Sequence, residues 1–135
     1  MRGGAAPRKG EKDMTGLDIY ILASAVLWEG ENEDTDSKKF TVQFLNHLLP
    51  ETLACENSLR RRDGMEELAA APIVKTIEQE IPWHDILCRT ALVYGLCWHF
   101  FENIGDLYRA ELYRNLFVSS INEYNAATWE ELPSL

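Results

Sequence analysis

The chain has 135 residues, of which 46% are apolar and 26% are charged, and these values are typical of one globular domain with a single hydrophobic core. Its 22 acidic and 13 basic residues give a net charge of -9. Because neutralisation of phosphates supplies most non-specific nucleic-acid affinity, this balance argues against a DNA-binding protein, although DNA could still slide past such a surface.

The cysteines and the apolar stretches indicate a soluble protein of a reducing cytosol. Cys55, Cys88 and Cys97 cannot all pair within one chain, and two of them lie in the most apolar part of the sequence, where buried thiols are common. The longest apolar stretches, 17–28 and 91–101, are shorter than the ~20 residues that span a bilayer. Residues 2–13 lack the basic-then-apolar order of a signal peptide.

The first helix is predicted from its N-terminal cap. Residues 1–13 are polar and rich in glycine, which predicts a disordered or flexible leader, and Met14 looks like a second, more natural beginning. Thr15 and Asp18 match a capping box, so we expect a helix from there to about Trp28. This helix is apolar on nearly every side and should be covered by partners in the fold or the assembly. The acidic loop 30–37 that follows lacks the glycine and the final glutamate of a calcium loop, and it is interpreted as a solvated loop.

The second helix is predicted to begin after Asp36 or Ser37 and to continue toward Arg62. Its apolar residues recur at spacings of three and four: Phe40, Phe44, Leu45, Leu48, Leu49 and Leu53. Pro50 should kink or restart the helix, and Asp63-Gly64 should end it. From 65 to 82 the pattern changes to alternating isoleucines, which predicts a short strand or hairpin.

Two further helices complete the predicted fold. The third, about Ile86–Ile104, has almost no polar face, and Gly95 in its middle suggests close approach of another backbone. Gly105 should stop it, and Asp106 should cap a fourth helix to about Asn125. We therefore expect a mainly α fold, a small bundle of about four helices with a short strand or hairpin segment between the second and third. The bundle should form one domain, 14–125, followed by a C-terminal arm, 126–135.

No catalytic or metal-binding pattern emerges from the sequence, so we expect no cofactor, no metal and no enzyme. His84, Cys88, Cys97 and His99 are the candidate zinc ligands, but Cys97 and His99 are two residues apart on a helix and point away from each other. No nucleophile elbow and no phosphate-cradling glycine loop is present. The carboxylate pairs are interpreted as surface charge: Glu66-Glu67, Glu78/Glu80 and Glu130-Glu131. The triplet Arg60-Arg61-Arg62 could bind a phosphate or a carboxylate, but at a helix C-terminus it is interpreted as a partner of the helix dipole.

Residues 40–125 carry three segments whose order is informative: FTVQFLNHLLPETLACENSLRRRDG, PIVKTIEQEIP and ALVYGLCWHFFENIGDLYRAELYRNLF. They resemble, in turn, the Asn-containing helix that ends in Arg and Gly, the short strand, and the closing helix pair with Tyr-Gly-Leu and Ala-x-x-Tyr of tailed-phage head-to-tail connector (adaptor) proteins. The chain departs from that family in its basic leader and in the aromatic run 97–101.

The resemblance implies a virion structural protein of the virus neck, made in the cytoplasm of the bacterial host. Such subunits form a homo-oligomeric ring, commonly of twelve, that binds the portal protein above and tail or stopper proteins below. The ring extends the DNA channel, and DNA passes through it without specific binding. No membrane is involved.

The arm 126–135 supplies the predicted protein-interface residues, Trp129, Leu132 and Leu135, which nothing local can bury. Trp129 and Leu132 are expected to insert into a groove of the portal or a neighbouring subunit, with Glu130 and Glu131 at the wet rim. Two alternatives remain open at this point. One is an acidic DNA-mimic inhibitor of a nuclease, and the other is a small helical enzyme that uses Cys97 or Cys88 as its nucleophile.

Overall fold

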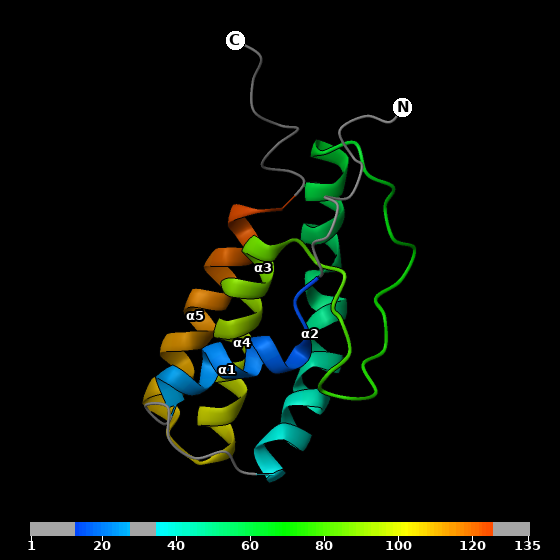
Figure 1. Ribbon diagram of the computed structural model, residues 1–135. Helices are drawn as coiled ribbons and strands as arrows, with labels where there is room; N and C mark the ends of the chain where they lie inside the picture. Colours follow the sequence, from blue (N-terminus) through cyan, green and yellow to red (C-terminus); the bar gives the residue numbers. More distant parts are fainter. Residues whose placement is uncertain (1–12, 28–34, 126–135) are drawn as a thin grey trace.

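The computed structural model describes residues 13–27 and 35–125, and helices account for most of this part of the chain. In chain order they are α1 (Gly16–Leu27), α2 (Thr35–Arg62), α3 (Asp85–Arg89), α4 (Ala91–Asn103) and α5 (Leu107–Glu123). The mainly α class and the small bundle are thus confirmed. In Figure 1, α1 crosses in front of α4, α5 lies beside α4, and a long loop descends beside α2 and returns to α3.

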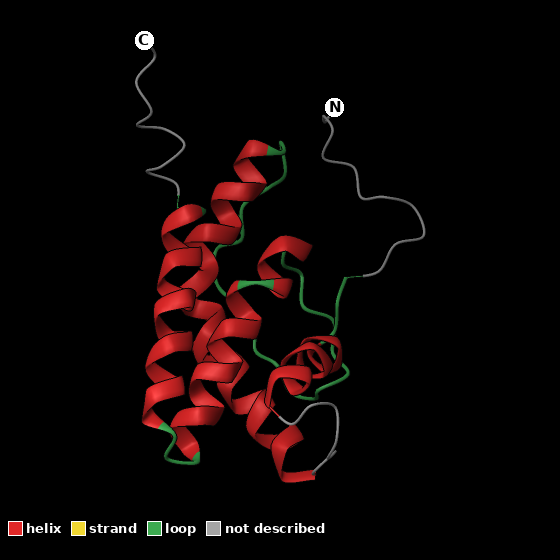
Figure 2. Ribbon diagram, turned by 90° about the vertical axis from the view of Figure 1, so that its left-hand side faces the viewer, coloured by secondary structure: helices red, strands yellow, loops and turns green. Residues whose placement is uncertain are grey.

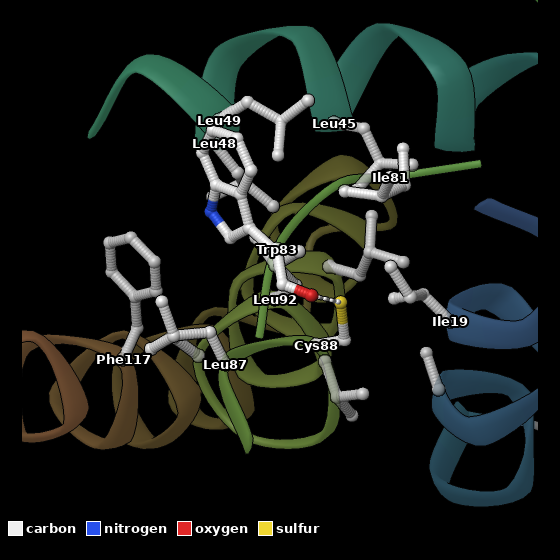
Figure 3. Close-up of a cluster of buried hydrophobic side chains, with 14 of the residues drawn as sticks. Ile19, Leu45, Leu48, Leu49, Ile81, Trp83, Leu87, Cys88, Leu92 and Phe117 are labelled. Atoms are coloured by element: carbon white, nitrogen blue, oxygen red, sulfur yellow. Dashed lines mark hydrogen bonds between the residues drawn. The ribbon is translucent and has the colours of Figure 1, made fainter. Parts of the chain in front are cut away.

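Helix α4 is the centre of the bundle, and α1, α2, α3 and α5 all pack against it. Leu92, Leu96 and Cys97 on this helix have no exposed surface. Figure 3 shows how the other elements meet there: leucines of α2, Trp83 of the long loop and Phe117 of α5 converge on one apolar cluster. Burial of such side chains supplies the main driving force for folding.

Local signals set the helix ends as the sequence predicts. Thr15 N donates to Asp18 Oδ2 (3.0 Å) and Asp18 N donates to Thr15 Oγ1 (3.1 Å), which is the capping box of α1. Asp106 accepts from the backbone N–H of Arg109 at the start of α5. Gly64 and Gly105 have φ of 75° and 82°, the left-handed conformation that ends a helix.

The sequence predicts that α2 kinks or restarts at Pro50. The structure shows no restart, because the helix is continuous from Thr35 to Arg62. Pro50 lies on the exposed side of the helix. Its ring nitrogen has no proton to donate to the carbonyl of Asn46 one turn earlier, so the helix continues without that hydrogen bond.

The predicted third helix is divided at Thr90 into α3 and α4. The Thr90 hydroxyl donates to the carbonyl of Ile86 at 2.6 Å, a bond that often bends a helix. Gly95 does face a close neighbour, but it is not a backbone. A Cβ at this position would lie 2.5 Å from Cδ2 of the buried Leu48, so the glycine makes room for a leucine side chain.

The predicted strand or hairpin between the second and third helices is absent from the described chain. Residues 65–84 form an irregular loop, and its only β contact with the described residues is an isolated antiparallel bridge between Thr15 and Glu80. The alternating isoleucines misled the prediction because Ile77 and Ile81 are buried whereas Ile73 is exposed. Backbone hydrogen bonds tie this loop to the start of α1 instead, from Gly16 N to Gln79 O and from Ile81 N to Met14 O.

Candidate functional site

The described part of the molecule exposes an apolar face on α5 that could contact another chain. The core side of this helix is made by Ala110, Phe117 and Ser120. On the other side Tyr108 is 83% exposed and Leu112 is 47% exposed, and Leu116 continues the same row at a spacing of four residues. A row of apolar side chains in water is more informative than a single one, because contiguous apolar surface marks binding sites.

Sequence reasoning missed this face. The spacing of Ala110, Phe117 and Ser120 predicts the core stripe of this helix, and the structure buries all three, but the polar residues between them suggest that the other sides are polar. The signal was present: once the core stripe is set aside, Tyr108, Leu112 and Leu116 still recur along the helix at a spacing of four residues. The predicted interface residues Trp129, Leu132 and Leu135 lie outside the described residues, as does the rest of the arm.

The most unusual polar feature is a fully buried carboxylate, Glu56, at the C-terminal half of α2. It accepts hydrogen bonds from Arg60 Nε (2.7 Å), from the backbone N of His84 (2.8 Å) and from His84 Nδ1 (3.0 Å). Arg60 also donates to the carbonyls of Glu66 and Pro82. A buried charge is tolerated only when it is paired in this way.

His84 lies between two carboxylates. Its Nδ1 faces Glu56 and its Nε2 is 2.8 Å from Asp63 Oδ2. The hydrogen bond to Glu56 raises the pKa of the imidazole, partial burial opposes this shift, and the bond to Asp63 adds to it. The pKa of Asp63 is lowered by its hydrogen bond with Arg62, against some desolvation, and His84 lowers it further. Both ring nitrogens are thus engaged by carboxylates in this structure.

Two asparagines on α2 hold the loop 65–84 in the same region. Asn46 donates to the carbonyl of Val74 and accepts from its N–H, at 2.9 and 2.8 Å. Asn57 makes the same pair of hydrogen bonds with Leu68, at 2.9 and 2.8 Å. Each side-chain amide thus pairs with both backbone groups of one residue, as a neighbouring strand would. The loop follows α2 through these contacts rather than through a sheet.

The candidate zinc ligands are not assembled. His84 is bound to carboxylates, Cys88 and Cys97 are buried, and His99 stacks between Trp98 and Phe44 with ring centroids 4.4 and 5.1 Å away. Over the described ranges, no group of three or more His, Cys, Asp or Glu side chains is placed to hold a metal ion. Burial lowers the pKa of His99 below its ordinary value, and the nearby carboxylate of Glu102 opposes this shift.

The cysteines lie in surroundings that suppress thiolate formation. Burial raises the pKa of Cys55 to about 11 and that of Cys97 to about 12, and it also raises the pKa of Cys88. Because the thiolate is the reactive form, these environments count against the cysteine-nucleophile alternative.

The remaining charged groups divide into surface and buried sets. The expected surface positions of Glu66, Glu67, Glu78 and Glu80 are confirmed, since all four are exposed. Within the arginine triplet, Arg60 follows the carboxylate alternative, because it binds the buried Glu56 and is not only a partner of the helix end. Arg61 forms a surface ion pair with Glu67 at 3.1 Å. None of the helices in the described part is long and apolar enough to cross a membrane.

Comparison with known proteins supplies no relative: no protein-family model, no curated protein and no solved structure matches the chain.

Proposed function

We propose that this chain is a structural head-to-tail connector subunit of a tailed phage, which forms a ring between the portal and the tail and extends the DNA channel. The observation that carries the proposal is the exposed apolar face of α5, because a subunit that works by contact with other chains needs such a surface. The net charge of -9 is compatible with a channel lining that does not hold DNA.

Residues of the segments that resemble the connector family pack the last two helices together, hold the loop 65–84 and end α2, and this supports the proposal. In the Tyr-Gly-Leu segment, Tyr94 on α4 lies 6.4 Å from the ring of Tyr113 on α5, which is the tyrosine of the Ala-x-x-Tyr segment. Ala110 of that segment is buried. In the first segment, Asn57 and Arg60 fix the loop and Gly64 ends α2.

The test is the composition of the particle. We expect mass spectrometry of purified virions of the phage that encodes the chain to detect the protein in multiple copies per particle, together with the portal protein. A second arm uses a truncation of residues 126–135. This deletion should leave helicity and melting nearly unchanged while it abolishes incorporation, if the arm grips the portal or a neighbouring subunit.

Two outcomes would contradict the proposal in different ways. Absence of the full-length protein from virions would defeat the connector assignment. Normal incorporation of the truncated chain would defeat only the role of Trp129, Leu132 and Leu135. Inhibition of a DNA nuclease by the purified protein at stoichiometric amounts would instead favour the DNA-mimic alternative.

A further inference from the structure

A second helix also exposes apolar side chains. On α1, Ile21 is 53% exposed, Val26 is 41% exposed and Ala25 between them is exposed as well. The core side of α1 is made by Ile19, Tyr20 and Ala23. Ile21 and Ala25 are one helical turn apart and project from the opposite side of the helix. We call the row of Ile21 and Ala25, together with the neighbouring Val26, the α1 face. We call the row of Tyr108, Leu112 and Leu116 the α5 face.

The two faces lie on different sides of the molecule. Helix α4 packs extensively against both α1 and α5, whereas α1 and α5 share no extensive contact. Figure 2 shows the result: α5 is the outermost helix on the left, and α1 is seen nearly end-on at the right. Because each face is exposed on a helix that packs inward on α4, the two faces point away from the bundle in different directions.

The charges of the two helices suit contact between them on different copies. α1 carries a single charged residue, the exposed Asp18, which lies in line with Ile21 and Ala25. α5 carries two arginines and two glutamates and is neutral in sum. Its Arg109 lies beside the α5 face with a side chain that is 59% exposed, 3.6 Å from Asp106 and over the ring of Phe101. A guanidinium has five N–H donors, so it can bind Asp106 and a second carboxylate together. Copies with a net charge of -9 repel each other, so association is favoured between helices that themselves carry little net negative charge.

We infer that the α1 face of one copy of this chain binds the α5 face of the next copy, with Asp18 approaching Arg109 at the edge of the contact. The contact is heterologous, because it joins two different surfaces, and repetition of such a contact generates a ring when the rotation closes. A contact between two α5 faces would stop at a dimer and leave Ile21 and Val26 in water. This inference rests on the proposed connector function for its biological role, but the pairing of the two faces can be measured on the isolated protein.

The experiment uses disulfide cross-linking of the full-length chain at high concentration under a mild oxidant. The variant Ala25→Cys/Leu112→Cys should form a ladder of covalent oligomers, because each copy then has one reactive thiol on each face. The native cysteines do not interfere, since Cys55, Cys88 and Cys97 are all buried. The matched control is Ala54→Cys/Leu112→Cys, in which an exposed alanine of α2 replaces the one on α1. The control should give no ladder beyond dimers.

A mixture of the single variants identifies the type of contact. Ala25→Cys mixed with Leu112→Cys should give cross-linked heterodimers in roughly tenfold excess over either homodimer, since thiols held at one contact react at a high effective concentration. Predominance of Leu112→Cys homodimers would overturn the inference in favour of a symmetric dimer. A yield no greater than that of the control would overturn it as well.

Failure of this inference and failure of the proposed function give different results. If virions contain the protein but the two faces do not cross-link, the ring uses other surfaces and the connector role stands. If the faces cross-link and virions lack the protein, self-association stands and the connector role falls.

Discussion

Replacement of the buried carboxylate of Glu56 is the most direct test of the polar cluster that it forms with Arg60, His84 and Asp63. Glu56→Gln keeps the size of the side chain and removes its charge, so that an NH₂ group faces the donors of Arg60 or His84. Removal of one partner from a buried ion pair costs about 3–5 kcal/mol. Arg60 and His84 are partly exposed and regain some hydration, which places the expected loss near the lower end, about 3 kcal/mol. Domains of this size have total stabilities of only about 5–15 kcal/mol, so the loss should be easily measured.

The pH dependence gives a second, independent readout of the same substitution. The pKa of His84 in the folded protein lies above its ordinary value of 6.5, mainly because of Glu56. The stabilisation from its protonated form is therefore fully present below pH 6.5 and is lost as the pH rises through the raised pKa. In Glu56→Gln the main cause of the shift is gone, so the fall in stability over this range should become smaller.

The assay is urea unfolding followed by tryptophan fluorescence, at a pH below 6.5 and at an alkaline pH. Glu51→Gln, an exposed glutamate on the same helix, is the control and should change stability by less than about 0.5 kcal/mol. A loss below about 1 kcal/mol for Glu56→Gln, or an unchanged pH dependence, would refute the view that Glu56 neutralises and positions His84.

Three further substitutions or probes test the packing and the loop. Gly95→Ala should destabilise by about 1–2 kcal/mol in urea unfolding, because overpacking against Leu48 outweighs the gain in helix propensity, and the double variant with Leu48→Val should recover most of it. Asn57→Ala removes two hydrogen bonds to Leu68 and should lower the free energy of unfolding by about 1–3 kcal/mol, with faster hydrogen exchange of the Leu68 amide. Unchanged exchange would contradict the role of Asn57 in holding the loop. A thiol reagent should label Cys55, Cys88 and Cys97 only in denaturant, and fast labelling of the folded protein would contradict their burial.

The helix boundaries could be predicted because their signals are local. A capping box involves residues three apart, as Thr15 and Asp18 show, and a helix-ending glycine acts on its own φ angle, as at Gly64. The prediction of a strand at 65–82 had no such local signal behind it, and it was wrong. Alternation of isoleucines predicts a strand only if a partner strand exists, and here the loop finds its partners in side-chain amides of α2.

The buried cluster could not be predicted for a different reason. Glu56 and His84 are 28 residues apart, and both belong to residue types that are usually exposed or half-buried. One clue in the sequence was the spacing of Glu56, which lies seven residues after Leu49 and three before Leu59, on the apolar face of the helix. The α5 face was within reach of sequence reasoning, because its three apolar residues have regular spacing, but nothing in a single sequence distinguishes an exposed apolar row from a second buried one.

The last prediction concerns the shape of the Arg60 side chain rather than its charge. Its guanidinium donates through Nε to Glu56 (2.7 Å), through one terminal nitrogen to the carbonyl of Glu66 (3.1 Å) and through the other to that of Pro82 (2.8 Å). The two carbonyls lie near the beginning and the end of the loop 65–84, so the single guanidinium of Arg60 holds both ends of the loop. Lysine keeps the charge but presents one nitrogen, which cannot reach three acceptors that a planar fork separates.

Arg60→Lys should therefore keep much of the attraction to Glu56 and lose both carbonyl bonds. The expected cost is about 2 kcal/mol, and most of it comes from the part-buried bond to Pro82, because the bond to Glu66 is exposed. Hydrogen exchange should quicken across the loop, while the amides of α4 change only in proportion to global stability. Arg61→Lys is the control, since its ion pair with Glu67 lies at the surface and should contribute less than about 1 kcal/mol. If Arg60→Lys is as stable as the wild type and the amides of loop 65–84 exchange no faster, the positive charge beside Glu56 is sufficient, and the planar guanidinium has no part in fixing the loop.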